Sequence, residues 1–100
     1  MAQNEKYNIL ESSRGLSLQV RISLKDGLHT RPAARLAQTA QQFKANILLK
    51  SDSGEVDAKS LLDILSLAPP PNALLTLLAN GTDAREALVA MAQLLEHLED

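Results

Sequence analysis

Hydrophobic and polar residues alternate strictly between residues 16 and 25. The apolar positions are Leu16, Leu18, Val20, Ile22 and Leu24. A period of two predicts a half-buried strand, and Asp26-Gly27 ends it. After Pro32 the apolar residues follow helical spacing, which predicts a helix that begins near Thr30 or Arg31. The pattern therefore changes from strand to helix across a short loop that contains His29.

The rest of the chain continues this alternation of strands and helices. Residues 47–49 and 55–58 flank Ser51-Asp52-Ser53-Gly54, which is typical of a hairpin. A short helix begins at Ser60 with a capping-box layout, since Asp63 follows three residues later, and ends before Pro69. Residues 73–79 predict a buried strand. A final helix follows, with Thr82 or Asp83 as its cap.

The element order β-α-β-β-α-β-α predicts an α+β fold. We expect an open-faced β-sandwich, in which three helices cover one face of a four-stranded antiparallel sheet and the other face meets solvent. Residues 1–15 lack sustained periodicity and are expected to form a mobile N-terminal extension. Residues 16–100 then form a single domain without internal repeats.

Composition and charge exclude several classes of protein. Of the 100 residues 45% are apolar, with 20 leucines but only Tyr7 and Phe43 as aromatics, and the net charge is −2. A disordered tail and a nucleic-acid-binding protein are both disfavoured. The absence of cysteine excludes disulfides, thiolate metal sites and a cysteine nucleophile. The apolar runs are too short to span a membrane, and the N-terminus is unlike a signal peptide. Both features favour a cytoplasmic protein.

Candidate chemistry is confined to two histidines. No metal-ligand cluster, Ser-His-Asp set or glycine-rich loop is present, which disfavours a hydrolase or metalloenzyme. His97, in the last helical turn, is best explained by a structural role. His29 lies at a predicted helix N-terminus, which binds anions. A phosphoryl group on its imidazole would face the amides of Thr30 and Arg31 and the Arg31 guanidinium, although spacing alone equally allows a loop residue near a cap.

Two motifs resemble one known family. Gly27-Leu28-His29-Thr30-Arg31-Pro32-Ala33 resembles the active-site motif of the HPr-type phosphocarriers of the bacterial phosphoenolpyruvate:sugar phosphotransferase system. Residues 57–67 are similar to the regulatory-serine segment of the same family. The resemblance covers about residues 16–98, and the fold of the family matches the element order given above.

The resemblance implies a phosphocarrier rather than an enzyme, without cofactor or metal and active as a monomer. His29 would accept a phosphoryl group on Nδ1 from phosphorylated enzyme I and pass it to an enzyme II (IIA) domain. Arg31 would stabilise this group, assisted by the Thr30 amide, and Pro32 would fix the helix start. Ser60 would correspond to the serine that HPr kinase/phosphorylase modifies, although its role as a helix cap explains it equally well.

The short helix also predicts a docking surface, because its apolar residues cover more than one face. We expect an apolar patch beside His29 that partners bury. Its residues, with those of the first turn after His29, are Thr30, Arg31, Ala34, Leu61, Leu62 and Leu65. The alternative is that the proline-rich loop or the extension covers these leucines.

Three features depart from the usual family pattern. Pro69-Pro70-Pro71 stands where family members usually carry glycine, which predicts a stiffer loop. The N-terminal extension is also unusual, and the hairpin at residues 50–55 resembles that of the nitrogen-regulatory branch, so the sugar and nitrogen branches both stay open. A regulatory module that is controlled by Ser60 phosphorylation and relays no phosphate is a further alternative.

Overall fold

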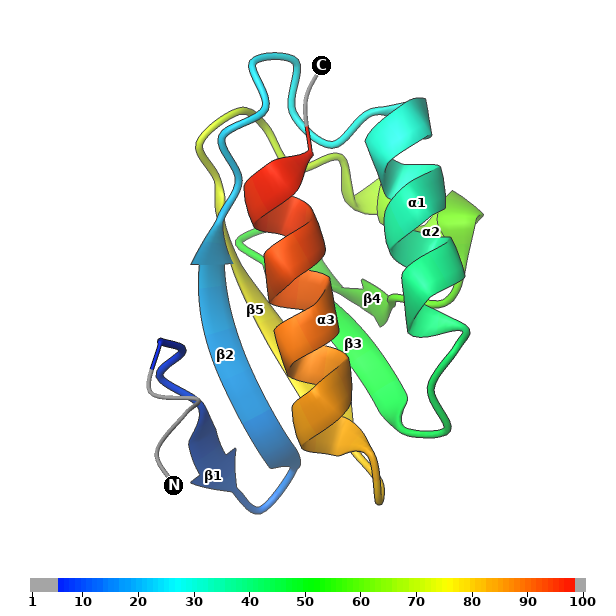
Figure 1. The fold of residues 1–100 in the computed structure, drawn as a ribbon. Coiled ribbons are helices and arrows are strands. Elements are labelled where there is room, and N and C mark those ends of the chain that lie inside the picture. The colour runs from blue at the N-terminus through cyan, green and yellow to red at the C-terminus, as the bar shows by residue number, and fades with distance from the viewer. Residues whose placement is uncertain (1–5, 99–100) are drawn as a thin grey trace.

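The structure, a computed structural model, describes residues 6–98. Five strands and three helices make up this part of the chain (Figure 1). The strands are β1 (Leu10–Ser12), β2 (Gly15–Arg21), β3 (Asn46–Ser51), β4 (Gly54–Asp57) and β5 (Leu74–Asn80). The helices are α1 (Thr30–Ala40), α2 (Leu61–Leu67) and α3 (Ala84–His97).

The strands form one antiparallel sheet in the order β1-β2-β5-β3-β4. Leu18, Leu77 and Leu49 lie side by side across its three central strands and are buried beneath the helices. The helices cover this face alone (Figure 1). The opposite face carries polar side chains such as Gln19 and Lys50. The predicted α+β open-faced sandwich is confirmed, but the strand count of four was wrong, because the described residues form five.

The additional strand, β1, comes from the segment that precedes the predicted domain. Leu10 pairs with Ser17 and Ser12 with Gly15 along the outer edge of β2. Three residues are too few to show a period of two, so the sequence pattern could not reveal this strand. The predicted mobility of the extension stays a prediction, and residues 1–5 lie outside the described residues.

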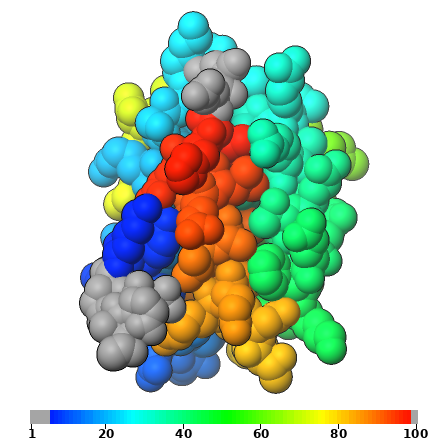
Figure 2. Space-filling model, in the orientation of Figure 1, coloured from blue at the N-terminus to red at the C-terminus, as the bar shows by residue number. Residues whose placement is uncertain are grey.

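The segment before β1 packs against α3. The Tyr7 hydroxyl donates to a Glu96 carboxylate oxygen at 3.0 Å, and the Lys6 ammonium lies 3.3 Å from the same oxygen. Figure 2 shows this segment against the side of α3 that faces away from α1. The start and the end of the described chain are therefore fastened to each other.

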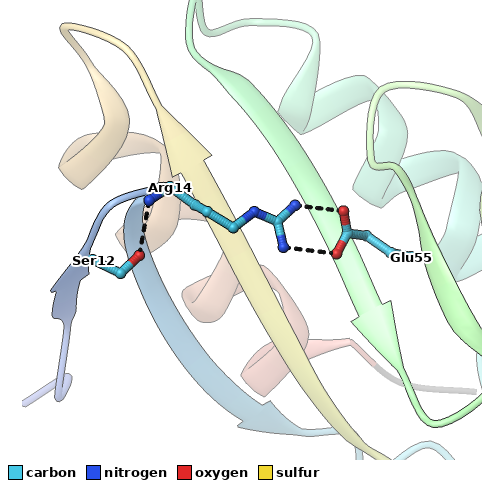
Figure 3. Close-up of polar contacts among 3 residues, drawn as sticks. All are labelled: Ser12, Arg14 and Glu55. Atoms are coloured by element: carbon cyan, nitrogen blue, oxygen red, sulfur yellow. Dashed lines mark hydrogen bonds and ion pairs between the residues drawn. The ribbon is translucent and has the colours of Figure 1, made fainter.

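The open face of the sheet carries one long bridge. Arg14, in the turn between β1 and β2, reaches across β5 and β3 to Glu55 in β4 (Figure 3). Its guanidinium donates to the two carboxylate oxygens at 3.1 and 2.6 Å, and this lowers the pKa of Glu55. Both side chains are substantially exposed to solvent, so the pair contributes little to stability.

Two helix caps differ in their bonding. The Ser60 hydroxyl accepts the Asp63 N–H at 3.2 Å, which confirms the predicted cap of α2. Asp83 occupies the cap position of α3 as predicted, but its carboxylate makes no cap hydrogen bond there. It instead accepts the N–H groups of Lys44 and Ala45 at 2.9 and 2.8 Å. Asp83 therefore fastens the turn between α1 and β3 to the start of α3.

Candidate functional site

His29 is the residue that caps the N-terminus of α1. Its backbone is extended, with φ −86° and ψ −170°, and its carbonyl accepts the Ala33 N–H at 2.9 Å. The predicted helix start at Thr30 is confirmed. The first amides of a helix have no intrahelical acceptor, and Pro32 has no N–H at all. The first turn therefore presents the amides of Thr30 and Arg31 beside an exposed imidazole.

The charged groups around the N-terminus of α1 favour the binding of an anion. Arg31 and Arg35 are both exposed and lie one turn apart on α1. The first turn of α1 contains no acidic residue. Because the N-terminus of a helix carries partial positive charge and a guanidinium binds phosphate oxygens strongly, this end of α1 can stabilise a phosphoryl group.

The loop before His29 has a fixed path. Gly27 adopts φ +71°, and its N–H donates to the Leu24 carbonyl at 3.1 Å. The His29 N–H turns back to the Gly27 carbonyl, also at 3.1 Å. The Leu28 side chain between them is buried in the core. Leu28 therefore anchors the loop from below, while the neighbouring imidazole stays at the surface.

The leucines of α2 differ in exposure. Leu62 is 77% exposed, so neither the proline-rich loop nor the N-terminal segment covers it. Leu61, Leu65 and Ala34 are half-buried, and the first two pack against the core. Of the three leucines that the sequence predicted as an apolar patch, only Leu62 is exposed, and their role as a docking surface stays a prediction.

Ser60 lies at the end of α2 that is remote from the His29 loop. The Gln41 side-chain amide donates to the Lys59 carbonyl at 2.8 Å, and the Lys59 ammonium donates to the Phe43 carbonyl, also at 2.8 Å. These bonds fix the start of α2 at the end of α1. The structure therefore brings His29, Thr30 and Arg31 together, but not Ser60. Side-chain bonds to distant carbonyls leave no periodic signal, so the sequence could not predict this placement.

The remaining candidates lie elsewhere or are absent from residues 6–98. His97 ends α3, where its Nδ1 lies 2.7 Å from the Gln93 carbonyl oxygen, as expected of a structural side chain. Within the described residues, no group of three His, Cys, Asp or Glu side chains could hold a metal ion. No helix in this part of the chain is long and apolar enough to span a membrane.

The geometry of the His29 site agrees with a comparison against protein families. A family profile described as "PTS HPr component phosphorylation site" matches residues 16–97. The chain belongs to the HPr family. It is therefore an HPr-type phosphocarrier, and members of this family carry a phosphoryl group rather than catalyse a reaction.

Two curated relatives with different names are similar to this chain. The HPr-like protein Crh of Halalkalibacterium halodurans is 38% identical over 78% of this chain and 93% of its own length. The phosphoryl donor subunit DhaM of the PEP-dependent dihydroxyacetone kinase of Escherichia coli is 42% identical over 80% of this chain, but only 17% of its own length. Family membership alone therefore leaves the relay partner open.

Solved structures of the HPr family match the fold. HPr from Thermoanaerobacter tengcongensis is 39% identical, with a TM-score of 0.77 over 80% of this chain and 90% of its own. Crh from Bacillus subtilis is 39% identical, with a TM-score of 0.65 over 77% of this chain and 88% of its own. It is described as a dimer with a swapped domain. HPr-family chains thus include dimers, in contrast to the expected monomer.

Proposed function

We propose that this chain relays a phosphoryl group from phosphorylated enzyme I to an enzyme II (IIA) domain through His29. The Nδ1 lone pair of His29 attacks the phosphorus of the donor phosphohistidine. The new N–P bond forms as that of the donor breaks. A histidine or cysteine of the acceptor then attacks the same phosphorus, and the bond from His29 Nδ1 to phosphorus breaks. The observation that carries this proposal is the position of His29, exposed at the cap of α1 beside the first-turn amides of Thr30 and Arg31 and the exposed Arg31 side chain.

The stabilisation available at this site suits a carrier. A negative charge at a helix N-terminus gains about 0.3–1 kcal/mol when exposed and up to about 2 kcal/mol in better geometry. The Arg31 guanidinium adds charge-assisted hydrogen bonds from an exposed position. Interactions of this size hold the phosphoryl group without preventing its onward transfer.

The partner would dock on α1 and α2 together. Leu62 offers the largest exposed apolar area of α2, with Leu61 and Leu65 at its border. Thr30, Arg31 and Ala34 would contribute the adjoining surface of α1. Arg31 and Arg35 would meet acidic groups of the partner, because both are exposed and positively charged.

The direct test is phosphorylation by phosphoenolpyruvate and a cognate enzyme I, from the sugar and the nitrogen branch in parallel. The wild-type chain should gain one acid-labile phosphate, and His29→Ala should gain none. His97→Ala is the matched control, because it removes the other histidine of the chain and should label normally. A wild-type chain that stays unlabelled with both donors refutes the relay.

The similarity to Crh, whose solved structure from Bacillus subtilis is described as a catabolite repression HPr, favours a second candidate. This candidate is a regulatory module that HPr kinase/phosphorylase controls through Ser60. A phosphate on Ser60 would lie at the start of α2 and repel acidic partner surfaces. Under this alternative, Ser60→Asp changes partner binding while His29→Ala keeps full biological activity. Under the relay, His29→Ala abolishes activity.

The relay proposal also includes a cellular setting and an assembly state. The carrier would act in the cytoplasm as a monomer. Sedimentation of the full chain tests the assembly state. A dimer at micromolar concentration would refute the proposed monomer and match the dimer described for the Crh structure.

A further inference from the structure

The loop between α2 and β5 runs beside the His29 loop (Figure 1). Ala68 ends α2 in the left-handed conformation, with φ 48° and ψ 52°. Three prolines follow, of which Pro69 is buried and Pro70 and Pro71 are exposed. Each proline fixes its own φ near −65° and lacks an N–H, so residues 69–71 form a stiff stretch whose backbone can only accept hydrogen bonds.

The two loops touch backbone to backbone. The Leu28 N–H donates to the Pro69 carbonyl at 3.4 Å. A Cβ on Gly27 would lie 2.7 Å from the Pro69 oxygen and 3.3 Å from the Pro70 carbonyl carbon. Only glycine allows this approach, and its φ of +71° also favours glycine. The backbone two residues before His29 therefore rests directly on the proline pair.

The far end of the same loop is fastened to the end of β2. The Ile22 N–H donates to the Ala73 carbonyl at 3.0 Å, and the Arg21 guanidinium donates to the Asn72 carbonyl at 2.7 Å. The segment that leads from β2 to His29 is thus bound at both ends to one proline-rich loop. Movement of that loop would move His29.

We propose that Pro69 and Pro70 are positioning residues for His29. This inference rests on the proposed relay. The stiff proline pair holds the Gly27–Leu28 backbone in place, and this fixes the imidazole relative to the amides of Thr30 and Arg31. Because phosphoryl transfer needs the nucleophile in line with the bond that breaks, a small displacement of the loop slows the step.

The test compares the double variant Pro69→Gly/Pro70→Gly with Pro71→Gly. The three changes are alike in kind, but Pro71 makes no hydrogen bond to residues 26–29 in the described structure. In the double variant we expect kcat for phosphorylation by enzyme I to fall about tenfold with KM unchanged. Hydrogen exchange at the Leu28 amide should accelerate. Pro71→Gly should retain the wild-type kcat and exchange rate.

The outcomes separate this inference from the relay. A double variant that transfers phosphate at the wild-type rate refutes the positioning role, as does an equal loss in Pro71→Gly. A wild-type chain that takes up no phosphate refutes the relay and the inference together. Where the double variant fails to fold, Pro70→Ala replaces it, with an expected loss of about threefold in kcat at unchanged KM, and an undiminished kcat refutes the positioning role equally.

Discussion

Removal of the exposed leucine of α2 should weaken docking without affecting folding. Full burial of a leucine side chain contributes about 1.5–3 kcal/mol. Leu62 is 77% exposed, so about 1–2 kcal/mol of that gain is still available to a partner. Since each 1.4 kcal/mol is about tenfold in affinity, Leu62→Ala should raise the Kd for enzyme I about 5- to 30-fold. The free energy of unfolding should change by less than about 0.5 kcal/mol.

Titration calorimetry with enzyme I measures the Kd, and urea denaturation measures the stability of the same variant. Leu10→Ala is the matched control, because Leu10 is 55% exposed but lies on β1, at the edge of the sheet opposite β4. It should bind like the wild type. Unchanged affinity in Leu62→Ala, or an equal loss in Leu10→Ala, would refute docking on α2.

Two further predictions concern stability. The Lys44 N–H, with that of Ala45, lowers the pKa of Asp83. The ionised Asp83 carboxylate therefore stabilises the fold at pH values above its pKa in the unfolded chain, and this stabilisation is lost as the pH falls through its pKa in the folded chain. In urea denaturation the wild type should therefore lose more stability than Asp83→Asn between pH 7 and about pH 3, and equal losses would contradict this role. Ala68→Gly should raise the free energy of unfolding by about 1 kcal/mol, because glycine tolerates φ 48°. Ala90→Gly, within α3, should lower it by about 1 kcal/mol, and a loss in both variants would argue against strain at Ala68.

The sequence predicted those parts of the fold that local patterns encode. Alternation revealed β2, helical spacing revealed α1, and the Ser60 cap followed from the position of Asp63. The position of His29 at a helix end was equally local, because it needs only a strand end, a turn and Pro32. Such features depend on residues only a few positions apart in the chain. The spacing of apolar and polar residues is informative over that distance.

The parts that the sequence did not predict depend on contacts between distant segments. Strand β1 exists because β2 offers an edge, and its own three residues show no pattern. Asp83 bonds to a turn 38 residues away rather than to its own helix. The contact of Gly27 with Pro69 joins two loops through backbone atoms, which carry no hydrophobic signature. Each of these becomes visible only when the sheet brings the segments together.

The contact of Lys6 and Tyr7 with Glu96 has a consequence for how this fold can be used. A domain whose two ends meet can be spliced into a longer polypeptide with little distortion of either. DhaM carries a stretch similar to this chain as 17% of its own length, as part of a longer polypeptide. Among the relatives of this chain, the similar stretch thus occurs both as nearly the whole protein and as a small part of a longer one.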